Sequence, residues 1–302
     1  MKIAVLDNVR GGSYEQGVRR AEEKYNIEVK YLTPSVTQLK GSIEEVIPAW
    51  QRDTIKELLE EGIKGIALPL LHPQPLISII KEAVSRGVAV ISYDIDGPET
   101  ERYFYVGTNN YLAGKIAGNN MTSLIGFKGE VVIDSISLTS YSCKGRIEGF
   151  KEAVGKYQNV KIVDIVSAQE DISKMFTLPS ETISTYKNLS GIFATTGLNA
   201  GSNAEVVKRQ SLQDKIKIVC FDLNSGIAQF MEEGIIDVAI VQRPYDMGYR
   251  VVEFLYRIIK FGLDEVLKSL PKSKIIDTGV EVVTKETLDS YKKSQEVLGI
   301  KI

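Results

Sequence analysis

Short apolar runs alternate with segments of helical period from one end of the chain to the other. The runs have the length of strands, and the segments between them repeat apolar residues every three or four positions, as one buried helix face does. This alternation is typical of βαβ units on a parallel sheet, so it predicts an α/β protein. The helical spacing is seen at Ile55, Leu58 and Leu59, and again at Leu76, Ile79, Ile80 and Ala83.

The order and length of the expected elements are similar in the two halves of the chain, which predicts two similar doubly wound parallel-sheet lobes. No glycine-, serine- or proline-rich linker marks the midpoint, so several short hinges are expected rather than one tether. The expected strands are Ile3–Leu6, Val29–Leu32, Ile66–Leu70, Val88–Tyr93, Tyr103–Val106, Val131–Asp134, Ile162–Val166, Gly191–Ala194, Ile216–Phe221 and Val238–Val241, and a further helix is expected over Met247–Phe261.

Two strands end on a carboxylate in equivalent contexts, Val-Ala-Val-Ile-Ser-Tyr-Asp (88–94) and Ile-Lys-Ile-Val-Cys-Phe-Asp (216–222). Ligands of open parallel sheets bind at the carboxyl ends of the strands. Asp94 and Asp222 therefore predict a binding cleft between two lobes that each contribute one carboxylate.

Composition narrows the partners of such a cleft. The 302 residues suffice for two cores, with 43% apolar and 25% charged residues. The formal charge is −2 and no block of Lys or Arg occurs, which argues against a broad nucleic-acid or membrane surface. Cys143, expected in a loop, and Cys220, expected in a strand, are interpreted as two unpaired thiols.

The first apolar run stops at Asp7, far short of a signal-peptide core or a transmembrane helix. Two interpretations follow from this start. The protein is cytosolic, or an export segment is absent from this chain.

Further polar and aromatic residues are expected on the same rim. Hydroxyl-rich ligands need acceptors, cationic donors and a flat apolar face. Candidates for these roles follow strands or open helices, and each has a structural alternative as a cap, a surface charge or a core aromatic: Gln242, Lys144, Arg10, Tyr14 and Trp50. Trp50 is expected to open a helix after a long connection from Thr33, which is either a roof over the cleft or a surface excursion.

His72, the only histidine, follows an apolar strand and is either a turn residue or a ligand contact. One histidine and two cysteines leave little for a metal site or a Ser-His-Asp mechanism. No nucleotide-binding glycine motif is present, so no cofactor is expected.

Five stretches resemble type I periplasmic sugar-binding proteins of the ribose-binding kind, a fold also used by the effector domains of LacI-type repressors. They are Val-Ile-Ser-Tyr-Asp-Ile-Asp-Gly-Pro (90–98), Tyr-Val-Gly-Thr-Asn-Asn-Tyr-Leu-Ala-Gly (105–114), Gly-Arg-Ile-Glu-Gly-Phe-Lys-Glu-Ala (145–153), Gly-Ile-Phe-Ala-Thr-Thr (191–196) and Gln-Arg-Pro-Tyr-Asp-Met-Gly (242–248). The resemblance implies lobes of residues 1–107 plus 243–276 and 108–242 plus 277–302, joined by a three-strand hinge.

By this resemblance the strand-end carboxylates are Asp94 and Asp222, and the amide at the last crossing is Gln242. Lys144 fills a slot usually held by Arg, and Thr196 one usually held by Asn. Asn8 begins the first loop, where ribose binders carry Asn-Pro-Phe-Phe; here Val9, Arg10 and Gly11 follow. The missing aromatic is then supplied by Trp50, Tyr14 or Phe221, and because Lys lacks the two-pronged donor of Arg, a different hydroxyl geometry is expected.

The resemblance implies an extracytoplasmic protein that captures a pentose or hexose and presents its closed form to an ABC importer or a sugar-sensing histidine kinase. A cytoplasmic LacI-type effector domain without its DNA-binding module is the alternative. A minor alternative is a phosphatase-like enzyme using Asp94 and Asp96, from the Asp-x-Asp-Gly stretch. Pro98, where that motif usually has Thr, favours binding without catalysis.

Overall fold

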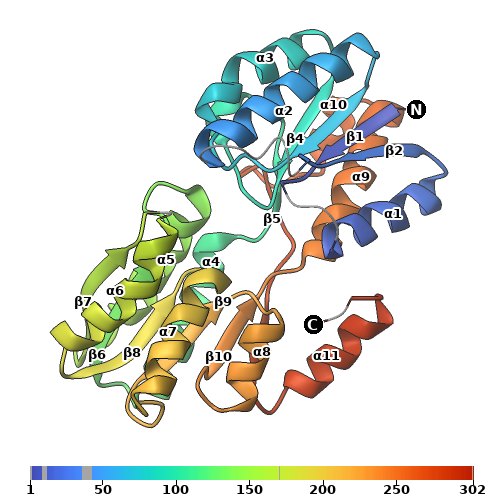
Figure 1. Cartoon of the computed structure of the whole chain (residues 1–302). Helices are drawn as coiled ribbons and strands as arrows, with labels where there is room; N and C mark the ends of the chain where they lie inside the picture. The colour runs from blue at the N-terminus through green and yellow to red at the C-terminus, as the bar shows by residue number, and fades with distance from the viewer. Residues whose placement is uncertain (1, 9–11, 36–42, 170, 301) are drawn as a thin grey trace. The chain divides into compact units, whose positions relative to one another are not determined.

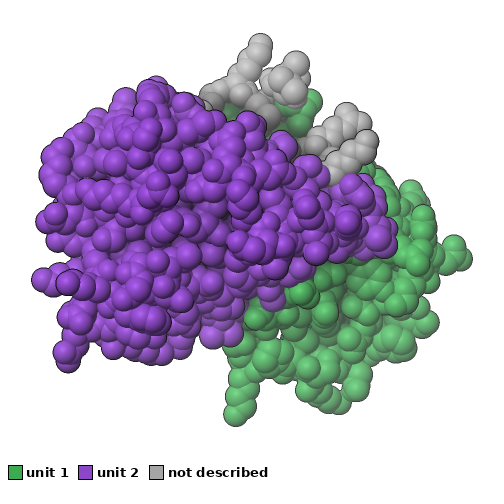
Figure 2. Space-filling view, turned by 90° about the horizontal axis from the view of Figure 1, so that it is seen from below, with its two compact units in different colours: residues 1–108, 243–278 green, residues 109–242, 279–302 purple. Residues whose placement is uncertain are grey.

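The computed structural model describes residues 2–8, 12–35, 43–169, 171–300 and 302. The chain divides into two compact units, residues 1–108 with 243–278 and residues 109–242 with 279–302, which Figure 2 shows in different colours. Each unit is thus assembled from separate stretches of chain. The chain passes from one unit to the other after residues 108, 242 and 278. The family resemblance predicts these crossings after residues 107, 242 and 276.

Unit 1 is a parallel sheet covered by helices on both faces (Figure 1). On one face lie α1 (Ser13–Tyr25), α9 (Pro244–Phe261) and α10 (Leu263–Lys268); on the other lie α2 (Ile43–Glu60), η2 (Gln74–Leu76) and α3 (Ile77–Ser85), and η3 (Pro98–Thr100) follows β4. The strands, in spatial order, are β11 (Ile275–Asp277), β5 (Tyr105–Gly107), β4 (Ala89–Tyr93), β3 (Gly65–Leu68), β1 (Lys2–Leu6) and β2 (Glu28–Leu32).

Alternation along each strand explains the two faces. In β1, Ile3 and Val5 pack with the α1 and α9 core, while Ala4 and Leu6 pack with the α2 and α3 core. A strand buried on both faces needs an unbroken apolar run, which is the pattern that the sequence carries.

Unit 2 repeats the arrangement. On one face lie α4 (Asn110–Leu124) and α5 (Tyr141–Val154); on the other lie α6 (Ile172–Thr185), α7 (Gly197–Arg209), α8 (Ser225–Glu232) and α11 (Leu288–Val297). The strands, in spatial order, are β12 (Glu281–Thr284), β10 (Val238–Val241), β9 (Lys217–Phe221), β8 (Leu189–Ala194), β6 (Gly129–Ser135) and β7 (Val160–Ser167). The pairs are parallel except β12 with β10.

The two sheets have the same strand order, so β4 of unit 1 occupies the position that β9 occupies in unit 2. The prediction of an α/β protein with two similar doubly wound sheets is confirmed. Asp94 and Asp222, which directly follow β4 and β9, are therefore equivalent residues of two related units.

A close helix pair positions the middle of α5. A Cβ atom on Gly149 would lie 2.0 Å from the backbone oxygen of Tyr111, so only glycine lets α4 and α5 approach this closely. The contact places the first turn of α4, which carries Asn110, against the middle of α5, which carries Arg146.

Some local predictions were wrong. Trp50 does not open α2, which begins at Ile43 and contains Pro48. A proline usually marks the start of a helix. Inside a helix it removes one backbone hydrogen bond, and α2 accommodates this loss. Lys144 and Cys143 lie in the first turn of α5, whose start at Tyr141 was expected later. Both cysteines are free and buried.

Candidate functional site

In unit 2, polar side chains gather around Asp222 at the carboxyl edge of the sheet. The two carboxylate oxygens of Asp222 accept bonds from Gln242 Nε2 at 2.9 Å and from the backbone N–H of Gly197 at 3.3 Å. Gly197 begins α7 directly after Thr196, so three of the predicted residues, Asp222, Gln242 and Thr196, come from neighbouring strand ends. The prediction that they share one edge follows from parallel strands ending on the same side.

Asp222 has a left-handed backbone, with φ 65°, and Asp94 has φ 60°. Asp and Asn adopt this region more readily than other non-glycine residues. In both units the backbone N–H of the aspartate donates to the adjacent strand, Asp94 to Val106 and Asp222 to Ile240. The turn that redirects each carboxylate is thus built in the same way twice.

Arg146, on α5, is a buried cation that the sequence analysis missed. Its Nε donates to Asn110 Oδ1 at 2.9 Å and its Nη1 donates to the carbonyl of Thr195 at 2.7 Å. The guanidinium carbon lies 3.8 Å from the ring centroid of Phe221, the residue before Asp222. Among the described residues no carboxylate forms an ion pair with Arg146, although only 3% of the residue is exposed.

Arg146 has N–H donors that the hydrogen bonds among the described residues do not use. A guanidinium carries five N–H donors, and the bonds to Asn110 and Thr195 use two of them. A buried charge without a counter-charge is costly, and such groups are typical of binding sites. Arg146 therefore offers a planar donor beside the strand end that carries Asp222.

Lys144 lies elsewhere on α5. It is an exposed residue whose Nζ lies 5.8 Å from the ring centroid of Tyr141. A sequence signal separates the two cations, because Arg146 is four residues before the buried Phe150 and three after the buried Cys143, on the apolar helix face. Lys144 does not share that spacing.

Thr196 is held by a polar network behind the edge. Asn199 Oδ1 accepts from the backbone N–H of Thr196 at 3.0 Å and from its hydroxyl at 2.8 Å. Asn199 donates to the carbonyl of Asp134, and Asn203 donates to the carboxylate of Asp134. These buried amides fix the first turn of α7 to the end of β6.

Burial raises the pKa of the Asp134 carboxyl above its usual value, against the bond from Asn203, which lowers the pKa. A raised folded pKa means that this carboxyl's contribution to stability is full below its unfolded pKa, about 3.9, and is lost as the pH rises through the folded value. We expect Asp134→Asn, which does not titrate, to become more stable relative to the wild type over that pH range. Urea unfolding at several pH values measures the difference in free energy of unfolding between Asp134→Asn and the wild type. Burial also raises the pKa of Asp237, but this residue is present in both proteins, so its effect cancels in the difference. A free-energy difference that does not change with pH would contradict the prediction.

In unit 1, Asp94 is placed by its backbone. The Tyr105 hydroxyl donates to the Asp94 carbonyl at 2.8 Å. Tyr14 packs against Tyr93, the residue before Asp94, with ring centroids 5.5 Å apart. Tyr14 thus packs beside the end of β4, the strand that Asp94 follows.

Asn8, two residues beyond β1, accepts a bond from Gln51 Nε2 at 3.3 Å. Gln51 is a fully buried residue of α2 that the sequence analysis did not select. A glutamine between apolar helix positions was the available signal. Arg10 lies outside the described residues, and His72 is half-buried in the connection after β3.

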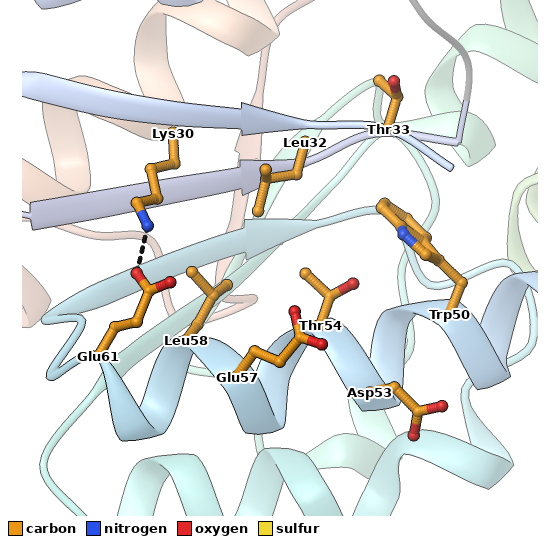
Figure 3. A pocket seen from close by; sticks show the side chains of 9 residues that line it. All are labelled: Lys30, Leu32, Thr33, Trp50, Asp53, Thr54, Glu57, Leu58 and Glu61. Carbon is orange, nitrogen blue, oxygen red and sulfur yellow. Dashed lines mark hydrogen bonds and ion pairs between the residues drawn. The ribbon is translucent and has the colours of Figure 1, made fainter. Parts of the chain in front are cut away.

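Trp50 lines a groove of about 280 Å³ between β2 and α2. Figure 3 shows Trp50 and Thr33 at one end and the ion pair of Lys30 with Glu61 at the other. Neither Asp94 nor Asn8 lines this groove, so Trp50 is not brought together with them there.

Asp96, the second aspartate of the Asp-x-Asp-Gly stretch, has a structural role. Arg102 forms two bonds to its carboxylate, at 2.8 and 2.6 Å, and both side chains are largely buried. The Ser92 hydroxyl and the backbone N–H of Gly97 both donate to Asp96 Oδ1, which also accepts the bond from Arg102 Nε. An aspartate held by this set of donors is not available as the general acid that a phosphatase needs.

Among the residues that the structure describes, no group of three or more His, Cys, Asp or Glu side chains comes together in a way that could hold a metal ion. No described helix combines the length and the apolar character that crossing a bilayer requires.

Comparisons with known proteins identify the family to which the chain belongs. Residues 11–264 match the family model described as a periplasmic binding protein domain. The xylose/arabinose-binding protein XylF of Sulfolobus acidocaldarius is 22% identical over 252 residues, which are 77% of this chain. The match covers 60% of the length of XylF.

Solved structures are similar over nearly the whole chain. An ABC transporter solute-binding protein from Burkholderia graminis in complex with D-arabinose is 28% identical, with a TM-score of 0.82 over 96% of this chain and 97% of that one. A chain of the solved XylFII-LytSN complex is 26% identical, with a TM-score of 0.77 over 94% of this chain and 98% of that one.

Proposed function

Since this chain belongs to the periplasmic binding protein domain family, we propose that it captures a monosaccharide, a pentose or a hexose, with Asp94 and Asp222 accepting hydrogen bonds from its hydroxyl groups. The protein is a binding protein and not an enzyme. The minor alternative of a phosphatase using Asp94 and Asp96 was wrong, because the family consists of binding proteins and Asp96 is engaged by Arg102.

The observation that carries the proposal is the donor and acceptor set at the edge of unit 2. Asp222 supplies acceptors, Gln242 an amide, and Arg146 a buried donor that lacks a counter-charge among the described residues. A sugar hydroxyl donates one bond and accepts others, so carboxylate and guanidinium together satisfy it. Asp94, with the same backbone turn, would supply the equivalent acceptor from unit 1.

We propose a pentose as the first ligand to test. XylF is named for xylose and arabinose, and the Burkholderia graminis protein was solved with D-arabinose. We also propose that the sugar-bound form acts outside the cytoplasm and is recognised by a membrane partner, either an ABC importer or a sugar-sensing histidine kinase. The solved XylFII-LytSN complex supports a protein partner for this fold.

Calorimetric titration with D-xylose, D-arabinose, D-ribose, D-allose and D-glucose tests the proposal. We expect saturable binding of one sugar per chain. Small-angle scattering of the same samples should show a smaller radius of gyration with sugar, because a ligand contacted by both units stabilises the conformation in which both reach it. Absence of binding to every sugar would overturn the proposed function.

A further inference from the structure

Gln51 is a buried glutamine with an unusual set of partners. It lies on α2 with none of its surface exposed, and its Nε2 donates to the carbonyl of Pro69 at 2.8 Å and to Asn8 Oδ1 at 3.3 Å. Pro69 follows β3 and Asn8 follows β1, which are neighbouring strands. One amide therefore joins two connections at the carboxyl edge of unit 1.

The chemistry of these partners fixes the orientation of both side-chain amides. A backbone carbonyl only accepts hydrogen bonds, so the atom of Gln51 that faces Pro69 must be the NH2 group. The second hydrogen of the same NH2 group points to Asn8, which must then present its oxygen. Asn8 is left with its Nδ2 group, which has no hydrogen-bond partner among the described residues.

The same amide also connects to the strand end that carries Asp94. The residue after Pro69, Leu70, donates its backbone N–H to the carbonyl of Ile95 at 2.9 Å, and Ile95 directly follows Asp94. Gln51 thus holds the connection after β3, which in turn holds the turn after β4. Removing the Gln51 amide would directly affect Asn8 and Pro69, which accept its hydrogen bonds.

We propose that Gln51 is a positioning residue that makes Asn8 a hydrogen-bond donor toward the bound sugar. With its oxygen occupied by Gln51, Asn8 presents Nδ2–H to a sugar oxygen, while Asp94 supplies an acceptor. This assignment rests on the proposed function. It gives the first loop a defined polarity, so that unit 1 offers the sugar one donor and one acceptor.

The buried oxygen of Gln51 supports a role beyond packing. Oε1 is shielded from solvent, and no hydrogen-bond partner for it lies among the described residues. Leaving a buried acceptor unsatisfied costs about 1–3 kcal/mol. A hydrophobic residue of similar size would avoid this cost, but it would leave the Pro69 carbonyl and Asn8 without this donor.

A double-mutant cycle between Gln51 and Asn8 tests the proposal. Gln51→Met keeps the length of the side chain and removes both donors, which frees Asn8 to rotate. Calorimetric titration with D-arabinose and D-xylose should show sugar binding about tenfold weaker in Gln51→Met, equivalent to the loss of one hydrogen bond of about 1.4 kcal/mol. In the Asn8→Ala background the same substitution should weaken binding clearly less than it does in the wild type, because Asn8 is already gone and only the bond to Pro69 is left to lose.

A matched control separates positioning from a general loss of stability. Gln213 also has a buried Oε1 for which the described part of the chain supplies no partner, but it precedes β9, at the amino end of that strand. Gln213→Met should leave sugar affinity unchanged. Urea unfolding of all variants reports stability independently of binding.

The possible results are distinct. Wild-type binding with unchanged affinity in Gln51→Met would overturn the positioning role and leave the proposed function intact. An equal loss in the wild-type and Asn8→Ala backgrounds would also overturn it, because Gln51 would then act without Asn8. A wild type that binds none of the sugars would remove both proposals together.

Discussion

Asp222→Asn and Asp94→Asn will each weaken monosaccharide binding by about tenfold to a hundredfold, while the protein stays folded. A hydrogen bond to a charged group contributes about 1.5–3 kcal/mol, and 1.4 kcal/mol corresponds to tenfold in affinity. The equivalent positions and equal backbone turns of the two aspartates predict losses of similar size. Calorimetric titration with the tightest-binding pentose measures both.

Asparagine removes the carboxylate charge without straining the backbone turn. Both aspartates have positive φ, and alanine at such a position costs about 1–2 kcal/mol of backbone strain that asparagine largely avoids. In Asp222→Asn the remaining side-chain oxygen accepts from either Gln242 or Gly197, and the other of these two bonds is lost. In both variants the loss of affinity then reports the carboxylate and not a strained backbone turn.

Exposed aspartates provide the controls. Asp264→Asn in unit 1 and Asp214→Asn in unit 2 remove the same charge away from the strand ends and should leave affinity unchanged. If Asp94→Asn and Asp222→Asn both bind as tightly as these controls, the carboxylates do not contact the sugar. A loss in one unit alone would confine the site to that unit.

Much of the fold could be predicted because the strands are buried on both faces. Such strands produce unbroken apolar runs, and in β4 and β9 the aspartate that ends the run also marks the edge of the sheet. The short strands β11 and β12 have no comparable pattern. They are defined by pairing with β5 and β10, which lie far away in sequence.

The candidate site was predicted less completely, and the reason is again the distance in sequence between partners. The network of Asn203, Asn199 and Asp134 joins residues more than sixty positions apart, so no local pattern reveals it. Gln51 reaches Asn8 in the same way. Residues that directly follow strands could be selected from the sequence, whereas Gln51, Arg146 and Asn199, which lie inside helices, could not.

Arg146 is the clearest example of a helix residue that the sequence analysis did not select. Its replacement should produce the second large loss of sugar affinity that we expect. Arg146→Met should weaken sugar binding by about tenfold to a hundredfold, since it removes a charged donor beside Asp222. Arg146→Lys keeps the charge but lacks the planar fork, and it should also bind more weakly than the wild type, because a single ammonium cannot serve Asn110, Thr195 and a sugar oxygen in one plane.

Lys144→Met is the matched control, because it removes a cation from the exposed face of the same helix. We expect its affinity to equal that of the wild type. Urea unfolding of Arg146→Met should separate an effect on binding from an effect on stability. Removing a buried charge that has no counter-charge is often neutral or stabilising. The same substitution also takes a hydrogen-bond donor from Asn110 and from the carbonyl of Thr195. If Lys144→Met weakens binding and Arg146→Met does not, the resemblance-based expectation for Lys144 is correct, and Arg146 serves only to hold α5 against β8 and β9.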